Sequence, residues 1–266
     1  MTGTRLDQGI ECSLTKGTEL IQEMKGPFNP HHVVSLIVFN IINNICFSVT
    51  CDVHDNYFKE MLYFLNSFLN IGNGFLEDVI PPLRLFHTQK LKTLMKDTEK
   101  FFGRALGGCH FPSVSDRSDL PYTDAVLHES MRLHTVAPSG IPHKTLCDTK
   151  VGGYDIPRGT TVLINHYGLH RDPEQWRDPQ VYNPDRFLDH EGKVATKPES
   201  WLPFSAGRRV CLRESVAKPE LHLLLAGIMR HFKVSLPPGA KVNLEPRGGS
   251  FVNVPHDYEL SFESRL

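Results

Sequence analysis

The chain has 266 residues, with 29 lysine or arginine and 30 aspartate or glutamate side chains, and a formal net charge of -1. This balance excludes binding to nucleic acid through bulk electrostatic attraction. The six cysteines show no Cys-x-x-Cys pair and the 14 histidines are scattered, which argues against a zinc ribbon, a disulfide framework or a multi-histidine metal site, and favours a reducing environment.

The first part of the chain predicts two helices. Apolar residues at helical spacing indicate a helix over residues 8–24, which the breakers Gly26 and Pro27 terminate. Residues 31–50 are the only long apolar stretch, and three asparagines interrupt it, so a buried core helix is favoured over a membrane span. Because the N-terminus is polar, with no apolar signal region, we expect the chain as given to have no membrane anchor.

The next segment predicts two further helices. Residues 56–69 carry an aromatic-rich apolar face, which is typical of a core helix and less often of a substrate-facing wall. Residues 87–102 place four lysines on a helical face. That face indicates a solvated helix more than a membrane or partner patch, because acidic residues interrupt it. Residues 103–119 lose the pattern and predict a loop.

The second half of the chain has a different pattern of predicted elements. Residues 121–134 predict a helix, and residues 135–168 contain short strand-like pieces separated by Gly and Pro turns. Residues 170–203 are rich in Pro and charge and predict an irregular meander. An apolar helix over residues 214–232 and a strand-forming tail complete a mainly α fold with small β-sheets, which is an α+β class.

The most informative stretch is Phe-Ser-Ala-Gly-Arg-Arg-Val-Cys-Leu-Arg-Glu, from Phe204 to Glu214. It places Cys211 just ahead of the apolar helix, where unpaired N–H groups, the helix dipole and neighbouring guanidinium groups make a thiol easier to deprotonate. Such a thiolate is a nucleophile or a metal ligand, and the alternative is a small buried hydrophobe. The pattern Phe-x-x-Gly-x-Arg-x-Cys resembles the haem-ligand loop of the cytochrome P-450 (haem-thiolate monooxygenase) family.

Three more motifs of that family occur in the same order. They are Glu129-x-x-Arg132, the pair Pro142-His143, and Pro-Asp-Arg186-Phe. Alone, an i,i+3 ion pair contributes only about 0.2–0.5 kcal/mol on a helix surface and indicates little. In order with the cysteine loop, the motifs identify the chain as a member of the family, and the resemblance implies that Glu129, Arg132 and Arg186 form a buried structural charge network.

The resemblance also implies a cofactor and its contacts. Cys211 would be the axial ligand of the iron of haem b (iron protoporphyrin IX), and Arg209 and His143 would contact its propionates. Phe204 would pack near the ligand sulfur, and Gly207 would permit the tight bend. Electrons would come from NADPH through NADPH-cytochrome P-450 reductase, and the activity implied is insertion of one atom of O2 into a C–H bond.

Three further stretches narrow the resemblance within the family: Val-Ala-Pro-Ser-Gly-Ile-Pro-His-Lys (136–144), His-Tyr-Gly-Leu-His-Arg-Asp (166–172) and Leu-Pro-Phe-Ser-Ala-Gly (202–207). In these stretches the sequence is similar to the steroid 17-alpha-hydroxylase/17,20-lyase branch. This likeness implies a steroid substrate and the endoplasmic reticulum membrane, where a chain without an anchor would be peripheral or cytosolic. It also implies a set of substrate-lining residues, although for the first of them a helix-terminal asparagine before a glycine is an equal alternative. The set comprises Asn70, Val136, Ala137, Ile141 and Phe251.

The sequence departs from the family pattern in several places. The anchor, the early helices and the long distal helix with its acid–alcohol pair are not found, although the distal helix should lie between residues 104 and 119. Arg213 stands where the family has glycine, and Pro219 falls inside the last helix. We therefore predict one partial haem-thiolate domain over residues 1–266, with a helical substrate-side region (1–110) and a haem-side region (119–266).

These departures leave no confident catalytic residue and predict impaired monooxygenase activity. One alternative is a non-catalytic remnant of a splicing event or gene model, with weak or no haem binding and at most a role as an interaction protein. A third hypothesis is a cysteine-based enzyme that uses Cys211 with His143 or His222, for which no further catalytic motif is present.

Overall fold

The computed structural model describes residues 3–47, 51–52, 54–56, 58–59, 113–241, 243, 252–253 and 255–265. Almost all of the helix expected over residues 56–69, and the whole of the helix expected over residues 87–102, lie outside these residues. Helix α1 (Gly3–Glu23) begins five residues before the predicted start, in a stretch with no apolar periodicity to announce it. Helix α2 (His31–Phe47) lies within the core segment predicted over residues 31–50 and begins at the same residue.

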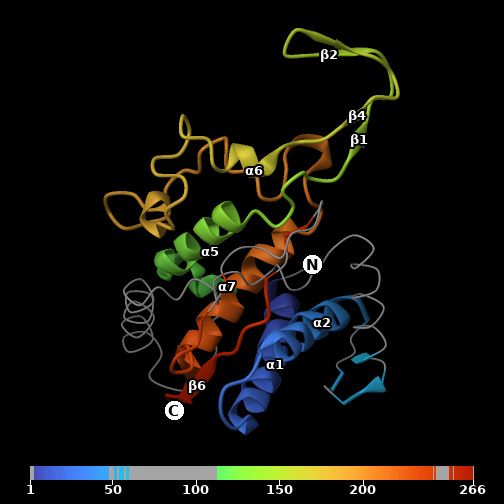
Figure 1. Ribbon diagram of the computed structural model, residues 1–266. Helices are drawn as coiled ribbons and strands as arrows, with labels where there is room; N and C mark the ends of the chain where they lie inside the picture. Colours follow the sequence, from blue (N-terminus) through green and yellow to red (C-terminus); the bar gives the residue numbers. More distant parts are fainter. Residues whose placement is uncertain are drawn as a thin grey trace.

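Helices α1 and α2 pack closely against each other (Figure 1). Gly17 lies at the contact, where an added Cβ would be 2.2 Å from Cδ1 of Ile37. Asn40 of α2 is 1% exposed, and its side-chain amide forms hydrogen bonds with both the N–H and the carbonyl of Cys51. This polar residue is therefore satisfied within the core, as expected for a core helix. Among the described residues, no helix has both the length and the apolar character needed to cross a membrane.

The centre of the fold is the helix pair α5 (Pro121–His134) and α7 (Glu214–His231). Helix α5 has the predicted bounds, begins with Pro at its first turn, and is buried from Tyr122 to Arg132. The short helices η3 (Val114–Asp119) and η4 (Pro184–Phe187) pack against it. Helix α7 continues through Pro219, and its apolar residues join those of α1, α2 and α5 in one core.

Among the described residues, three small antiparallel sheets of two strands each accompany the helices. They pair β1 (His143–Lys144) with β4 (Thr161–Val162), β2 (Thr149–Val151) with β3 (Tyr154–Ile156), and β5 (Phe232–Ser235) with β6 (Ser261–Ser264). The first two sheets form a ribbon that projects from the body (Figure 1). The predicted strand Thr-Val-Leu-Ile-Asn pairs over only its first two residues. The mixed, mainly helical fold class is confirmed.

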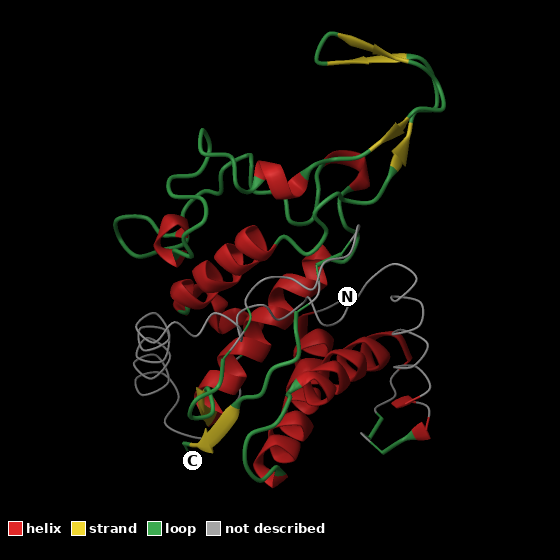
Figure 2. Ribbon diagram, in the orientation of Figure 1, coloured by secondary structure: helices red, strands yellow, loops and turns green. Residues whose placement is uncertain are grey.

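The meander from residue 170 to residue 203 contains mostly loops and turns, as Figure 2 shows. It connects the short helix α6 (His166–Leu169) to the cysteine loop, which contains the single turn η5 (Gly207–Arg209). The aromatic side chains of Trp176, Phe187 and Trp201 in this segment are buried, so the meander packs on the core although it lacks regular hydrogen bonding.

Candidate haem-thiolate site

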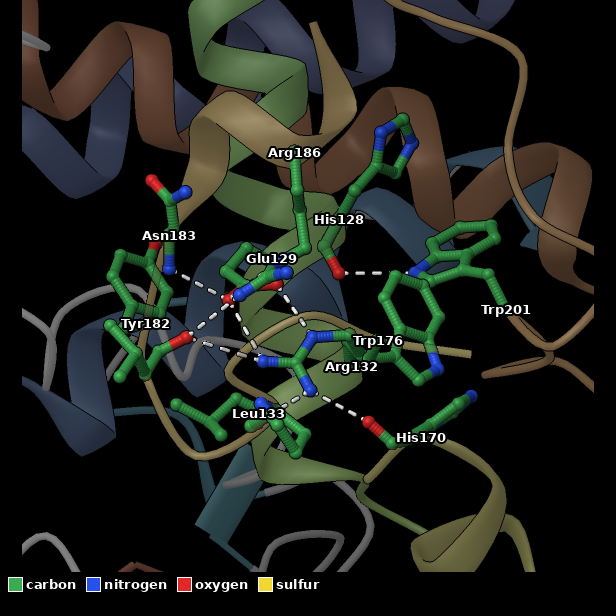
Figure 3. Close-up of polar contacts among 12 residues, drawn as sticks. His128, Glu129, Arg132, Leu133, His170, Trp176, Tyr182, Asn183, Arg186 and Trp201 are labelled. Carbon is green, nitrogen blue, oxygen red and sulfur yellow. Dashed lines mark hydrogen bonds and ion pairs between the residues drawn. The ribbon is translucent and has the colours of Figure 1, made fainter. Parts of the chain in front are cut away.

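The buried end of α5 carries an ion-pair network centred on Glu129 (Figure 3). Glu129 and Arg132 are both 0% exposed, and Arg132 donates from Nε to Oε2 at 2.7 Å and from Nη2 to Oε1 at 2.9 Å. Arg186 approaches Oε1 with its Nε at 3.2 Å, and the backbone N–H of Asn183 donates to the same oxygen at 2.7 Å. The structure thus brings the three charged residues together, with no carboxylate oxygen left without a donor.

Both arginines also bind backbone carbonyl groups of the meander. Arg132 Nη1 donates to the oxygens of His170 at 2.6 Å and Pro179 at 2.9 Å, and its guanidinium lies 5.2 Å from the ring centre of Trp176. Arg186 Nη1 donates to the carbonyl of Arg177 at 2.8 Å. The network therefore fixes an irregular segment to α5, which explains how a stretch without regular structure keeps a defined position.

An aromatic cluster lies beside the network, toward the cysteine loop. Trp176 and Trp201 flank Phe187, with ring centroids 5.9 Å and 6.0 Å from it. The ring of His128 meets Trp201 edge-on at 4.7 Å, and Trp201 Nε1 donates to the carbonyl of His128 at 3.1 Å. Burial lowers the pKa of His128 to about 3, so its imidazole is neutral and packs as an aromatic ring.

The cysteine loop is a compact turn. Gly207 has φ +68°, the left-handed region that glycine enters without steric cost, and Ser205 also has a positive φ of +64°. The backbone N–H of Cys211 donates to the carbonyl of Phe204 at 2.9 Å, which closes the turn, and the N–H of Glu214 donates to the carbonyl of Cys211 at 3.3 Å as α7 begins. Cys211 is half-buried.

The remaining predicted cofactor contacts are divided between this turn and the projecting ribbon. Phe204 is half-buried and packs on the core, with Nζ of Lys218 5.4 Å from its ring centre. Arg209 is exposed in η5, and His143 is half-buried at the start of the projecting ribbon. Arg213 is exposed at an ordinary φ of -101°, so the backbone accepts it where the family pattern has glycine.

The predicted substrate-lining residues are only partly described. Val136 and Ala137 are half-buried just beyond α5, and the carbonyl of Val136 accepts a hydrogen bond from the N–H of Asn253 at 2.8 Å. Ile141 is 79% exposed, which places it on the surface. Asn70 and Phe251 lie outside the described residues, as does most of the segment in which the distal helix was sought.

The residues present fit a haem group by their chemistry. Within the described ranges, no group of three or more His, Cys, Asp or Glu side chains is placed to hold a bare metal ion. A porphyrin iron needs only one axial protein ligand on this side, and Cys211 offers a half-buried thiol at the end of a closed turn. A Cβ built on Gly207 would meet nothing within 4 Å, so no described residue fills the space beside this glycine.

The histidines proposed for a cysteine-based enzyme are placed differently. His222 is 0% exposed and its Nδ1 lies 2.9 Å from Oδ1 of Asp124, which Arg117 also binds with Nε at 2.9 Å from Oδ2. Although burial raises it, the hydrogen bonds and charges of His222 and Arg117 lower the pKa of Asp124 to about 2. In the described part of the chain, no hydrogen bond joins the Cys211 thiol to His222 or His143, so the nucleophile–base pair is not formed.

Sequence reasoning missed most of the polar partners in this region. The carbonyl groups that accept from Arg132 and the backbone N–H of Asn183 carry no side-chain signal. In the sequence, His170 is marked only by its place in a His-x-Asp-Pro run, which assigns it no partner. The structure places its side chain between Thr135 at the end of α5 and Leu202 ahead of the cysteine loop.

These observations define a class of protein that combines a loop thiol just ahead of a helix with a buried carboxylate bound by two arginines. The model of the family named Cytochrome P450 matches residues 102–262, which is more than half of the chain. The chain belongs to the cytochrome P450 family, whose members are oxidoreductases of the haem-thiolate monooxygenase type.

Relatives with curated names support this membership. The chain is 44% identical over 129 residues to "Steroid 17-alpha-hydroxylase/17,20 lyase" of Squalus acanthias, which covers 48% of this chain and 25% of that protein. It is 38% identical over 162 residues to "Cytochrome P450 2U1" of Homo sapiens, covering 61% and 30%. It is 40% identical over 172 residues to "Cytochrome P450 2S1" of Homo sapiens, covering 64% and 34%.

The chain thus spans between 25% and 34% of the length of these relatives. Their names differ, since one is a steroid hydroxylase and two carry other cytochrome P450 names at similar identity. The comparisons therefore establish the family and leave the branch to be proposed.

Proposed function

We propose that this chain is the haem-side part of a steroid monooxygenase, and that it holds haem b through Cys211. The observation that carries the proposal is the closed turn from Phe204 to Cys211, which lies ahead of α7 and leaves a half-buried thiol at its end. When bound, haem supplies the activation of dioxygen, with electrons from NADPH delivered through NADPH-cytochrome P-450 reductase.

The residues of this chain have distinct roles in the proposal. Cys211, as thiolate, donates electron density to the iron, and Arg209 and His143 bind the propionates. Phe204 shields the sulfur from water, and Gly207 keeps the turn free of a side chain at its open face. Glu129 and its two arginines hold the meander that leads into the loop.

The steroid class and the cellular site rest on one relative and on the family. Similarity to a steroid 17-alpha-hydroxylase/17,20 lyase over 129 residues supports a steroid substrate. Val136 and Ala137 are the described residues that we assign to the substrate side. We place the protein at the endoplasmic reticulum membrane because of its family. We retain the proposed division into a substrate-side region (1–110) and a haem-side region (119–266).

We expect turnover to be slow or absent, because the sequence offers no acid–alcohol pair to direct protons on the distal side. Haem binding and catalysis are thus separate questions for this chain. The alternative is a remnant that takes up no haem, and the same experiment distinguishes the two.

The test is a carbon-monoxide difference spectrum of the reduced, purified chain after haem reconstitution. A thiolate-type Soret band is expected for the parent and for Cys147→Ala, which removes an exposed thiol on the projecting ribbon. Cys211→Ala should abolish the band. If the parent takes up no haem, or Cys211→Ala behaves as the parent does, the proposal fails. Steroid turnover with reductase and NADPH then tests the substrate class and the predicted impairment.

A further inference from the structure

His170 links α5 to the cysteine loop through both nitrogens of its ring. Its Nε2 lies 3.0 Å from the backbone N–H of Leu202, two residues before Phe204. Its Nδ1 lies 3.0 Å from Oγ1 of Thr135, the residue that ends α5. The side chain is 0% exposed, so neither nitrogen exchanges these partners for water.

These partners determine which nitrogen carries the proton. A backbone N–H only donates, so Nε2 must be the bare nitrogen, and a neutral ring then has its proton on Nδ1. The hydroxyl of Thr135 donates to the carbonyl of Arg132 at 2.7 Å and accepts from Arg171 Nη1 at 3.4 Å, and its second lone pair can accept from Nδ1–H of His170. Burial keeps the ring neutral, and the pKa of His170 is lowered to about 3.

The backbone of His170 belongs to the same set of contacts. Its carbonyl accepts from Arg132 Nη1 at 2.6 Å, so the Glu129 network and the ring act on one residue. Beyond Leu202, the carbonyl of that residue accepts from the N–H of Ser205 at 3.1 Å, at the start of the turn that ends at Cys211. A continuous series of hydrogen bonds therefore runs from the charge network to the thiol loop.

We propose that His170, as the neutral Nδ1–H tautomer, is a positioning residue that sets the register of the cysteine loop on α5. The ring spans two partners that no shorter side chain reaches together. A glutamine amide occupies the place of Nε2 and can accept from Leu202, whereas an asparagine amide occupies the place of Nδ1 and can donate to Thr135. The two substitutions therefore separate the link to the loop from the link to α5.

The first test uses the chain without haem. Nitrogen-15 shifts of the histidine rings should show His170 protonated at Nδ1 and bare at Nε2 from pH 5 to pH 8. Hydrogen exchange at the Cys211 amide should be at least about fivefold faster in His170→Asn than in the parent, because the backbone N–H of Leu202 loses its acceptor. His170→Gln should stay within about twofold, as should the control His190→Gln, whose side chain is 90% exposed.

The second test bears on the ligand role, which rests on the proposed function. After reconstitution, the fraction of carbon-monoxide complex with a thiolate-type band should fall at least about twofold in His170→Asn and be retained in His170→Gln. An Nε2–H ring, or unchanged Cys211 exchange in His170→Asn, overturns the inference. If the parent takes up no haem while the exchange pattern holds, the proposed function fails and the positioning role stands.

Discussion

Replacing Arg132 with alanine should be the most damaging single change in the described part of the chain. The side chain is 0% exposed and donates to Glu129 at 2.7 and 2.9 Å, and to the carbonyl groups of His170 and Pro179 at 2.6 and 2.9 Å. Its loss leaves a fully buried carboxylate with incomplete compensation, which costs about 3–5 kcal/mol. We expect a decrease of that size in the free energy of unfolding.

The other arginine supplies an internal comparison. Arg186 is 11% exposed at its side chain and contributes one contact of 3.2 Å to Glu129, so Arg186→Ala should cost about 1–3 kcal/mol. Arg177→Ala is the control, because that side chain is 95% exposed and, among the described residues, its ion pair is with its neighbour Asp178 at 3.6 Å. It should change the free energy of unfolding by less than about 0.5 kcal/mol.

Urea unfolding followed by tryptophan fluorescence measures all three variants. Both tryptophans report on this region, since Trp176 lies against Arg132 and Trp201 binds the carbonyl of His128. A loss below about 1 kcal/mol for Arg132→Ala, the range of an exposed pair, would refute the reasoning. A loss smaller than that of Arg186→Ala would refute it as well.

Four further substitutions test three separate features. Gly207→Ala at φ +68° and Gly192→Ala at φ +76° should each cost about 1–2 kcal/mol in urea unfolding, but only the first should weaken haem uptake in a titration. Asp124 has a folded pKa of about 2 against an ordinary 3.8, so its interactions with His222 and Arg117 together contribute roughly 2 kcal/mol of stability that is present above pH 4 and lost toward pH 2. Asp124→Asn should therefore flatten the decrease in the free energy of unfolding over this acid range. Burial raises the pKa of Glu220 to about 7, so ionisation of this side chain destabilises the fold as pH rises from 4.5 through 7. Urea unfolding midpoints should therefore show Glu220→Gln to be more stable than the parent at pH 8 but not at pH 4.

The parts of the fold that the sequence predicted best carry local signals. Helix α5 has the predicted bounds because Pro121 favours its first turn and apolar positions recur to its end. The start of α1 was missed since residues 3–7 lack apolar periodicity. The strand predicted from Thr161 is short because its partner β1 offers only two residues for pairing. Pairing length depends on the partner strand, which periodicity within one segment does not report.

For the candidate site, the charged members were predictable and their partners were not. The spacing of Glu129 and Arg132 places them on one helical face, and the family resemblance supplied Arg186. The acceptors of Arg132 are backbone carbonyl groups, which every residue has, so no residue type distinguishes those of His170 and Pro179. The tautomer of His170 likewise follows from a backbone donor and appears only when the chain is folded.

The contacts that position the cysteine loop do not depend on the residues expected on the other face of the haem. Every hydrogen bond from Glu129 through Arg132 and His170 to Leu202, and from there to the turn of Cys211, is made by residues between 129 and 211. None of these described contacts involves a residue before Glu129. A chain with this network intact should therefore present its thiol correctly even where turnover is lost. Haem uptake, rather than steroid oxidation, is for that reason the property by which this chain should be judged.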